Sequence, residues 1–214
     1  MNARTEVLSR IRRALADVPE DERPEDVPVT RNYSPDGMPA AGSPEAVELL
    51  ARRLADYGAS VRLVADGTVP TAVTRILAAR DAACVVVPRG FPPAWQAELD
   101  PVRVLDDHPQ LPVRDLDRVD SVLTTVAVAI AETGTLVLDG GPGQGRRALT
   151  LVPDHHVCVL RAEQVVACVP DALARLEPAR PLTFVSGPSA TSDIELDRVE
   201  GVHGPRTLHV LIVV

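Results

Sequence analysis

The sequence has 214 residues, of which 45% are hydrophobic and 24% are charged, and this composition is typical of a chain that folds around one substantial core. Its net charge of -8 argues against nucleic acid or an anionic membrane surface as the main partner, because both attract concentrated positive charge. All 22 cationic residues are arginines, so Schiff-base chemistry and a Walker lysine are excluded.

The first part of the chain is expected to be an appendage. Residues 3–18 carry apolar side chains at helical spacing, and the proline- and acid-rich stretch that follows has no periodicity. No apolar run is long enough to span a membrane, and the first residues do not resemble a signal peptide, so we expect a cytoplasmic protein. We predict an N-terminal helix and arm over residues 1–42 and one α/β domain over residues 43–214.

The domain is expected to combine parallel and antiparallel strands. A helix begins after Ser43 as N-cap and ends at Gly58. β-Branched runs then alternate with helical stretches, which predicts a parallel sheet. Later strands follow one another through short turns, which predicts antiparallel or mixed pairing. The expected strands are 61–64, 84–88, 102–105, 124–131, 135–139, a run within 149–153, 156–161, 182–187 and 207–214, with helices up to about residue 79 and over 162–176. The predicted fold class is therefore α/β with an open mixed sheet.

Two consecutive segments after the middle of the chain are candidates for a site. In the turn AETGT, Glu132 is either a solvated turn residue or a nucleophile or general base, and Thr133, Gly134 and Thr135 shape the turn. The glycine-rich segment 139–147 is either a flexible loop or an anion cradle built from backbone N–H groups. Its candidate ligand-binding residues are Gly143, Gln144 and Arg146, with Arg147 as the alternative to Arg146 for a bidentate contact to an anion.

Histidines and cysteines give little support for a metal. His155 and His156 begin a predicted strand, so their side chains point to opposite faces and only one can face a given pocket. A neutral histidine at a strand end is favoured over a metal ligand. The three cysteines are far apart in apolar settings, which predicts reduced core thiols and no iron–sulfur or zinc site on this chain.

The polar stretch 187–206 gives the strongest indication of a site. It offers several N-cap residues and acids at the start of a predicted short helix, followed by a histidine between glycines and an arginine. The acids are also explained by favourable interaction with the helix dipole. The candidate ligand-binding residues here are Ser189, Thr191, Asp193, Glu195, His203 and Arg206.

The segments AETGTLVL, LVPDHHVCVL, GPSATSDIE and GVHGP, in this order, resemble the LUD-domain family, formerly an uncharacterised domain family, and within it the lactate-utilization members. The resemblance runs from about Ser43 to the end of the chain. It implies a three-layer α/β fold similar to the sugar-phosphate isomerase and CoA-transferase group, in which Glu132 resembles the strand-end glutamate of the transferases. Where family members often have a glycine and an aspartate, this chain has Thr125 and Ala127.

The resemblance also implies a function. It predicts a component of an L-lactate oxidation system that acts with iron–sulfur subunits and binds a small anion in a cleft at the strand ends. The chain itself is expected to bind no cofactor, because the iron–sulfur clusters would belong to the partners. Two alternatives stay open: a stand-alone transferase or isomerase acting on an acyl-CoA or a sugar phosphate through Glu132, and a non-catalytic sensor of a small molecule.

Overall fold

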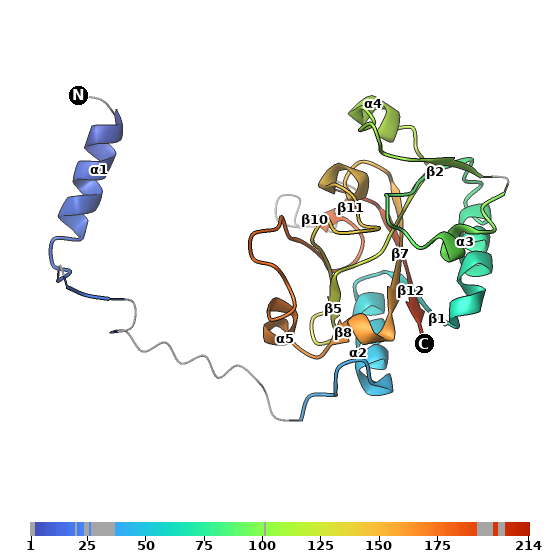
Figure 1. Ribbon diagram of the computed structural model, residues 1–214, viewed down its shortest axis with the longest axis horizontal. Helices are drawn as coiled ribbons and strands as arrows, with labels where there is room; N and C mark the ends of the chain where they lie inside the picture. Colours follow the sequence, from blue (N-terminus) through green and yellow to red (C-terminus); the bar gives the residue numbers. More distant parts are fainter. Residues whose placement is uncertain are drawn as a thin grey trace. The chain divides into compact units, whose positions relative to one another are not determined.

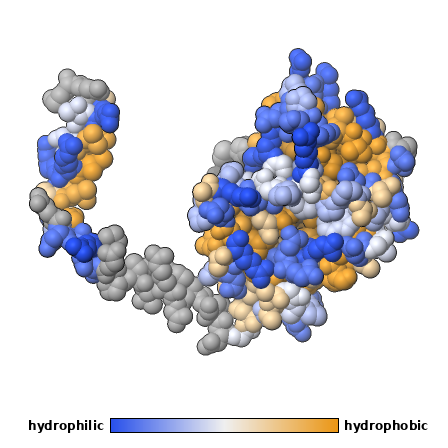
Figure 2. Space-filling view, in the orientation of Figure 1, coloured by the Kyte–Doolittle hydropathy of each residue, from blue (hydrophilic) through white to orange (hydrophobic). Residues whose placement is uncertain are grey.

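The computed structural model describes residues 3–19, 21–23, 26, 37–100, 102–191, 199–200 and 204–214, and for residues 190–191 and 199–200 it describes the backbone alone. The chain divides into two compact units, Met1–Tyr33 and Ser34–Val214 (Figure 1). The first unit contains α1 (Ala3–Ala14), which buries none of its residues. Apolar side chains form a stripe along one side of α1, as Figure 2 shows, and Val7, Ile11 and Leu15 are exposed.

The larger unit is built around a six-stranded sheet whose order is β1-β12-β7-β4-β2-β3. Every strand pair in it is parallel. Its strands are β1 (Ser60–Val64), β2 (Cys84–Val86), β3 (Arg103–Leu105), β4 (Ser121–Thr124), β7 (His155–Arg161) and β12 (Thr207–Val213). The central strands β7 and β12 are almost continuously buried, because a parallel sheet is covered on both faces. The strand expected over residues 207–214 is confirmed as β12.

A second, four-stranded sheet has the order β8-β5-β6-β9. Its strands are β5 (Val128–Ile130), β6 (Thr135–Leu138), β8 (Val165–Val166) and β9 (Thr183–Val185), and a separate two-stranded pair is formed by β10 (Ala190–Thr191) and β11 (Val199–Glu200). β5 and β6 pair in antiparallel fashion, as the short turn between them predicts, whereas β5 and β8 are parallel. The α/β class is confirmed, but the mixed pairing belongs to this second sheet and not to one open sheet.

Short helices complete the unit. They are α2 (Pro44–Asp56), α3 (Val69–Ala78), α4 (Val113–Leu116) and α5 (Val169–Leu173), with 3-10 helices η2 (Asp66–Thr68), η3 (Pro93–Gln96), η4 (Arg147–Thr150) and η5 (Ala162–Gln164). Ser43 caps α2 by accepting a hydrogen bond from the N–H of Ala46, as the sequence predicts.

Three expected elements are wrong. The run 124–131 is not one strand, because β4 ends at Thr124 and the chain crosses to the second sheet before β5. The region 162–176 is not one helix: its β-branched pair forms β8, and Pro170, which lacks the N–H needed in a helix interior, occupies the first turn of α5. Residues of the expected strand after 148 lie instead in η4 and the turn that follows.

Different elements pack against the two faces of the six-stranded sheet. α3 and Trp95 pack with side chains of one face, among them Val157 and Leu211. α2 and the second sheet cover the opposite face, where Leu50 and Leu136 pack with Cys158 and Val210 (Figure 1). The outer face of the second sheet packs against Ala172 of α5. The chain leaves the six-stranded sheet twice. After β4 it forms β5 and β6 of the second sheet and returns to β7, and after β7 it forms β8 and β9 and returns to β12.

Candidate functional site

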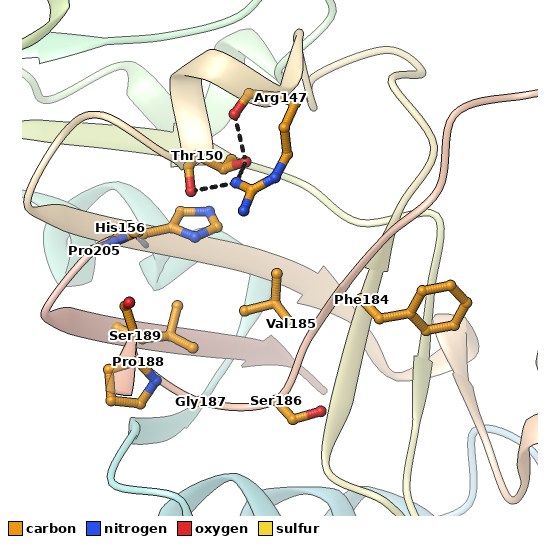
Figure 3. Close-up of a pocket in the computed structure, with 12 residues that line it drawn as sticks. Arg147, Thr150, His156, Phe184, Val185, Ser186, Gly187, Pro188, Ser189 and Pro205 are labelled. Carbon is orange, nitrogen blue, oxygen red and sulfur yellow. Dashed lines mark hydrogen bonds between the residues drawn. The ribbon is translucent and has the colours of Figure 1, made fainter. Parts of the chain in front are cut away.

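A pocket of about 220 Å³ lies at the amino ends of β7 and β12, beside β9 of the second sheet. It is called the Arg147 pocket below (Figure 3). Both of its walls come from segments that return to the six-stranded sheet, one leading into β7 and the other leading from β9 to β12. The lining residues are Arg147, Thr150, His156, Phe184, Val185, Ser186, Gly187, Pro188, Ser189, Gly204, Pro205 and Leu208. The pocket lies at strand ends, and its identity with the anion-binding cleft expected from the sequence stays a prediction.

Arg147 supplies positive charge at the mouth of the pocket. It begins η4, and its Nη1 donates to the carbonyl oxygen of Thr150 at 2.8 Å and to Oγ1 of Thr150 at 3.0 Å. Within the described residues, Nε and Nη2 of Arg147 make no hydrogen bond. Burial lowers the pKa of the guanidinium, but arginine stays protonated at neutral pH. The side chain is exposed, so a ligand can reach the two remaining donor nitrogens from solvent.

His156 lies in the floor of the pocket and is 2% exposed. Its Nε2 is 2.6 Å from Oγ1 of Thr124, the last residue of β4. Burial, reinforced by the positive charge of Arg147, lowers the pKa of His156 to about 4, so the imidazole is neutral at pH 7. Nδ1 has no hydrogen-bond partner among the described residues. The ring lies below the Arg147 guanidinium in Figure 3.

A chain of hydroxyl groups connects the AETGT turn to the pocket. Oγ of the lining residue Ser186 is 2.7 Å from Oγ1 of Thr135, which is 2.7 Å from Oγ1 of Thr133. Thr133 and Thr135 therefore reach the pocket only through Ser186. Gly134 has a φ of +59°, and a Cβ at this position would lie 2.7 Å from Cβ of Arg53 in α2, so the turn needs glycine to approach the helix.

Glu132 occupies the same turn but is not among the residues that line the pocket. Its side chain is exposed, and its N–H donates to the carbonyl oxygen of Ala167, which directly follows β8. The proposed role of Glu132 as a nucleophile or base stays a prediction.

The glycine-rich segment lies next to the Arg147 pocket. Gln144 and Arg146 line a cavity of about 140 Å³ that shares Arg147 and Thr150 with that pocket. Arg146 also lines an open cavity of about 530 Å³ at the carboxyl ends of β2 and β3. Its Nε and Nη2 donate to the carboxylate of Asp107 at 2.7 and 3.0 Å, so its guanidinium is engaged within the protein.

Contacts of Gly143 and Thr125 hold the glycine-rich segment in place. The N–H of Gly143 donates to the carbonyl oxygen of Arg89, and a Cβ on Gly143 would lie 2.9 Å from Oγ1 of Thr125. Oγ1 of Thr125 donates to the carbonyl oxygen of Pro142 at 3.1 Å and so holds this segment against the carboxyl end of β4.

The polar stretch is only partly described. Ser189 lines the pocket, and its N–H donates to the carbonyl oxygen of Pro205 at 2.8 Å. Arg206 is exposed and forms an ion pair with Asp154. The backbone of Thr191 lies in β10, and Asp193, Glu195 and His203 lie outside the described residues.

The remaining histidine of the pair faces the other side of the sheet. Nδ1 of His155 is 2.7 Å from Oγ of Ser121, and its Nε2 is 2.8 Å from Nδ1 of His209. Of the pair, only His156 lines the Arg147 pocket, which agrees with the expectation that one of the two can face a given pocket. Within the described ranges, no three histidine, cysteine or acidic side chains form a group suited to a metal ion. None of the described helices has the length and apolar character needed to cross a membrane.

Several lining residues are not among the candidates from the sequence. Thr150 and Ser186 belong to no motif in the sequence, and the sequence leaves open whether Arg146 or Arg147 contacts an anion. The one signal in the sequence is alternation along the strand, which placed either His155 or His156 at a pocket.

The fold and the pocket define an α/β protein with two sheets and a small cationic pocket between them. The family model named LUD domain matches residues 113–213. A "Lactate utilization protein C" from Deinococcus radiodurans is 45% identical over 217 residues, which cover 99% of this chain and 95% of that protein. A protein of the same name from Bacillus subtilis is 28% identical over 128 residues, covering 55% and 53% of the two chains.

A crystal structure of a DUF162 family protein from Deinococcus radiodurans is also similar, with a TM-score of 0.68 and 39% sequence identity, and the match covers 79% of this chain and 97% of that one. The chain belongs to the LUD-domain family. The resemblance of the sequence segments to this family is confirmed.

Proposed function

We propose that the chain is a component of an L-lactate oxidation system, that it acts with iron–sulfur subunits, and that it binds a small carboxylate in the Arg147 pocket. Two observations support the proposal. A relative that matches nearly the whole chain carries the name lactate utilization protein C, and relatives that match about half of it share the name. The pocket presents a guanidinium with two unengaged nitrogens beside a neutral imidazole, and such donors suit a carboxylate.

The size of the pocket favours a ligand as small as lactate. Its volume of about 220 Å³ is below the range of roughly 300–1,000 Å³ that is typical of pockets for larger ligands. A lactate ion fits within it, whereas most of an acyl-CoA would lie outside. The exposed position of Glu132, away from the lining residues, gives the transferase alternative no support from this pocket.

The proposed role of this chain is to hold and orient the substrate or product. Oxidation of lactate to pyruvate removes a pair of electrons and a pair of protons, and the proposal assigns the electrons to iron–sulfur clusters on the partner subunits. The three cysteines of this chain are widely separated, and both Cys158 and Cys168 are buried, which suits a division of labour between subunits.

The binding test compares the wild type with Arg147→Gln and with Arg114→Gln, in which the lost arginine is exposed outside the pocket. Hydrogen bonds to a charged group contribute about 1.5–3 kcal/mol, so Arg147→Gln is expected to weaken binding of L-lactate and pyruvate by at least about tenfold in calorimetry. Arg114→Gln should bind as the wild type does. Equal binding by all three folded proteins would show that the pocket does not hold the anion.

The system test is purification of the tagged chain from its own host without oxygen. Co-purification of iron–sulfur proteins with lactate-dependent dye reduction, together with lost lactate-dependent growth in Arg147→Gln cells, is the expected result. A colourless chain that comes alone and binds the anion without converting it would overturn the oxidation role in favour of the sensor alternative.

A further inference from the structure

We propose that Thr124 fixes the tautomer of His156 so that the Arg147 pocket presents two hydrogen-bond donors, and that the pocket therefore selects a 2-oxo carboxylate over the corresponding 2-hydroxy acid. The inference rests on the proposed function, because it concerns the ligand of the same pocket. It names the oxidised partner of the lactate–pyruvate pair as the form that is held more tightly.

The first step is the direction of the hydrogen bond between Thr124 and His156. Oγ1 of Thr124 and Nε2 of His156 are 2.6 Å apart, so they share one hydrogen bond whose donor is either the hydroxyl or the ring N–H. The proposal assigns the hydroxyl as the donor and Nε2 as the acceptor, because an imidazole nitrogen is a stronger acceptor for that hydroxyl than the neighbouring sulfur of Cys158.

The second step is the group behind Thr124. Thr124 and Cys158 are register partners in β4 and β7, and the two side chains are hydrogen-bonded. Burial raises the pKa of the Cys158 thiol to about 12, so at neutral pH the sulfur keeps its proton and does not need the Thr124 hydroxyl as a donor. That hydroxyl is therefore left to donate to the imidazole.

The third step follows from the neutral state of His156. A neutral imidazole carries one proton, and if Nε2 accepts, the proton is on Nδ1. Nδ1 is the ring nitrogen without a partner among the described residues, and His156 lines the pocket. The imidazole therefore offers an N–H to the ligand, next to the N–H groups of Arg147 (Figure 3).

The donor pair matches one ligand class better than the other. A 2-oxo carboxylate has a carboxylate oxygen and a keto oxygen side by side, and both are acceptors. A 2-hydroxy acid carries a proton on the second oxygen, and no acidic side chain is among the described residues that line the pocket. The hydroxyl group of a 2-hydroxy acid must then donate its proton to a weaker acceptor, such as the hydroxyl of Ser186, or to the ligand's own carboxylate. We expect pyruvate to bind at least about fivefold more tightly than L-lactate.

The test combines affinity with a direct reading of the tautomer. Calorimetry measures pyruvate and L-lactate on the wild type, Thr124→Val and Thr124→Ser, and nitrogen-15 NMR of labelled protein identifies the protonated nitrogen of His156. The wild type should show the Nδ1–H form and the preference for pyruvate. Thr124→Val keeps the shape but removes the donor, so the Nε2–H form should appear and the affinity ratio should approach one. Thr124→Ser keeps the hydroxyl and should show both the Nδ1–H form and the preference for pyruvate.

Each contrary outcome has a distinct meaning. If L-lactate binds as tightly as pyruvate and Arg147→Gln still abolishes binding of both, this inference is overturned, but the proposed anion site is retained. An Nε2–H tautomer in the wild type would also overturn it. Absence of binding by either ligand, with no effect of Arg147→Gln, would overturn the proposed function as well. If Thr124→Val does not fold, the wild type and Thr124→Ser still decide the tautomer and the affinity ratio.

Discussion

His155 and His156 are neighbours in the sequence, but their surroundings differ because a strand alternates its faces. His155 is wholly buried beside Ser121 and His209, whereas His156 meets Thr124 and forms part of the pocket floor. Ser121 lies 34 residues before His155, and Thr124 lies 32 residues before His156. Alternation can be read from the sequence, but those partners depend on the pairing of β4 with β7.

Because His155 and His156 are both buried with lowered pKa values, we predict that the protein loses stability in mild acid. Burial, together with the neighbouring His209, lowers the pKa of His155 to about 3, and that of His156 is about 4. The unfolded chain takes up protons below a pKa of about 6.5 while the folded chain does not, so the unfolding free energy falls as pH falls. The expected loss between pH 7 and pH 5 is about 2 kcal/mol for each histidine, measured by urea unfolding.

The control for this prediction replaces the histidines one at a time. His155→Gln and His156→Gln keep a polar side chain but cannot titrate, so each should remove its own share of the pH dependence even if it lowers stability at pH 7. Carboxylates ordinarily titrate near pH 4, so a lower limit of pH 5 limits their contribution. An unchanged pH dependence in both variants would contradict the assignment.

At the scale of elements, the segment between β6 and β7 determines where the cationic group of the pocket lies. Arg146 anchors this segment to Asp107 after β3, and the next residue, Arg147, turns toward the pocket. Although burial opposes it, the hydrogen bonds from Arg146 and from the N–H of Leu111 lower the pKa of Asp107. Arg146 thus has a structural role in this fold. Its sequence context alone does not distinguish that role from ligand binding.

We expect loss of this anchor to destabilise the fold. The side chains of Arg146 and Asp107 are only 28% and 11% exposed, and they share two hydrogen bonds. Arg146→Gln and Asp107→Asn should each lower the unfolding free energy by about 2 kcal/mol, and the double variant should cost less than the sum. Urea unfolding measures all three.

Arg114 and Asp115 provide the comparison pair, since they are 3.7 Å apart with side chains 81% and 42% exposed. Breaking that pair should change the unfolding free energy by less than about 0.5 kcal/mol. If Arg146→Gln instead leaves stability unchanged and weakens anion binding, Arg146 is a ligand-binding residue, as the sequence predicts.

At the scale of the whole molecule, the two compact units differ in how much they bury. α1 has 12 residues and no buried side chain, whereas the unit Ser34–Val214 contains the sheets and their cores. Isolated helices shorter than about 12–15 residues are marginal in water, so α1 adds little to the stability of the rest.

We therefore predict that a variant lacking residues 1–33 unfolds with nearly the same free energy as the full chain. The expected difference is below about 1 kcal/mol in urea, and pyruvate binding should be unchanged because every residue of the Arg147 pocket remains. A loss of more than about 2 kcal/mol, or weaker binding, would show that the arm packs on the larger unit.

The sequence by itself determined the α/β class, the α2 helix with its Ser43 cap, the antiparallel β5 and β6 pair and the family, because these depend on local periodicity, capping and short motifs. Only the tertiary structure decided that the chain leaves the six-stranded sheet for the second sheet twice and returns each time, and that Arg147 rather than Arg146 meets His156 at a pocket. The physical reason is that strand pairing and ion pairs between distant segments set these positions, and neither is encoded in the spacing of neighbouring residues.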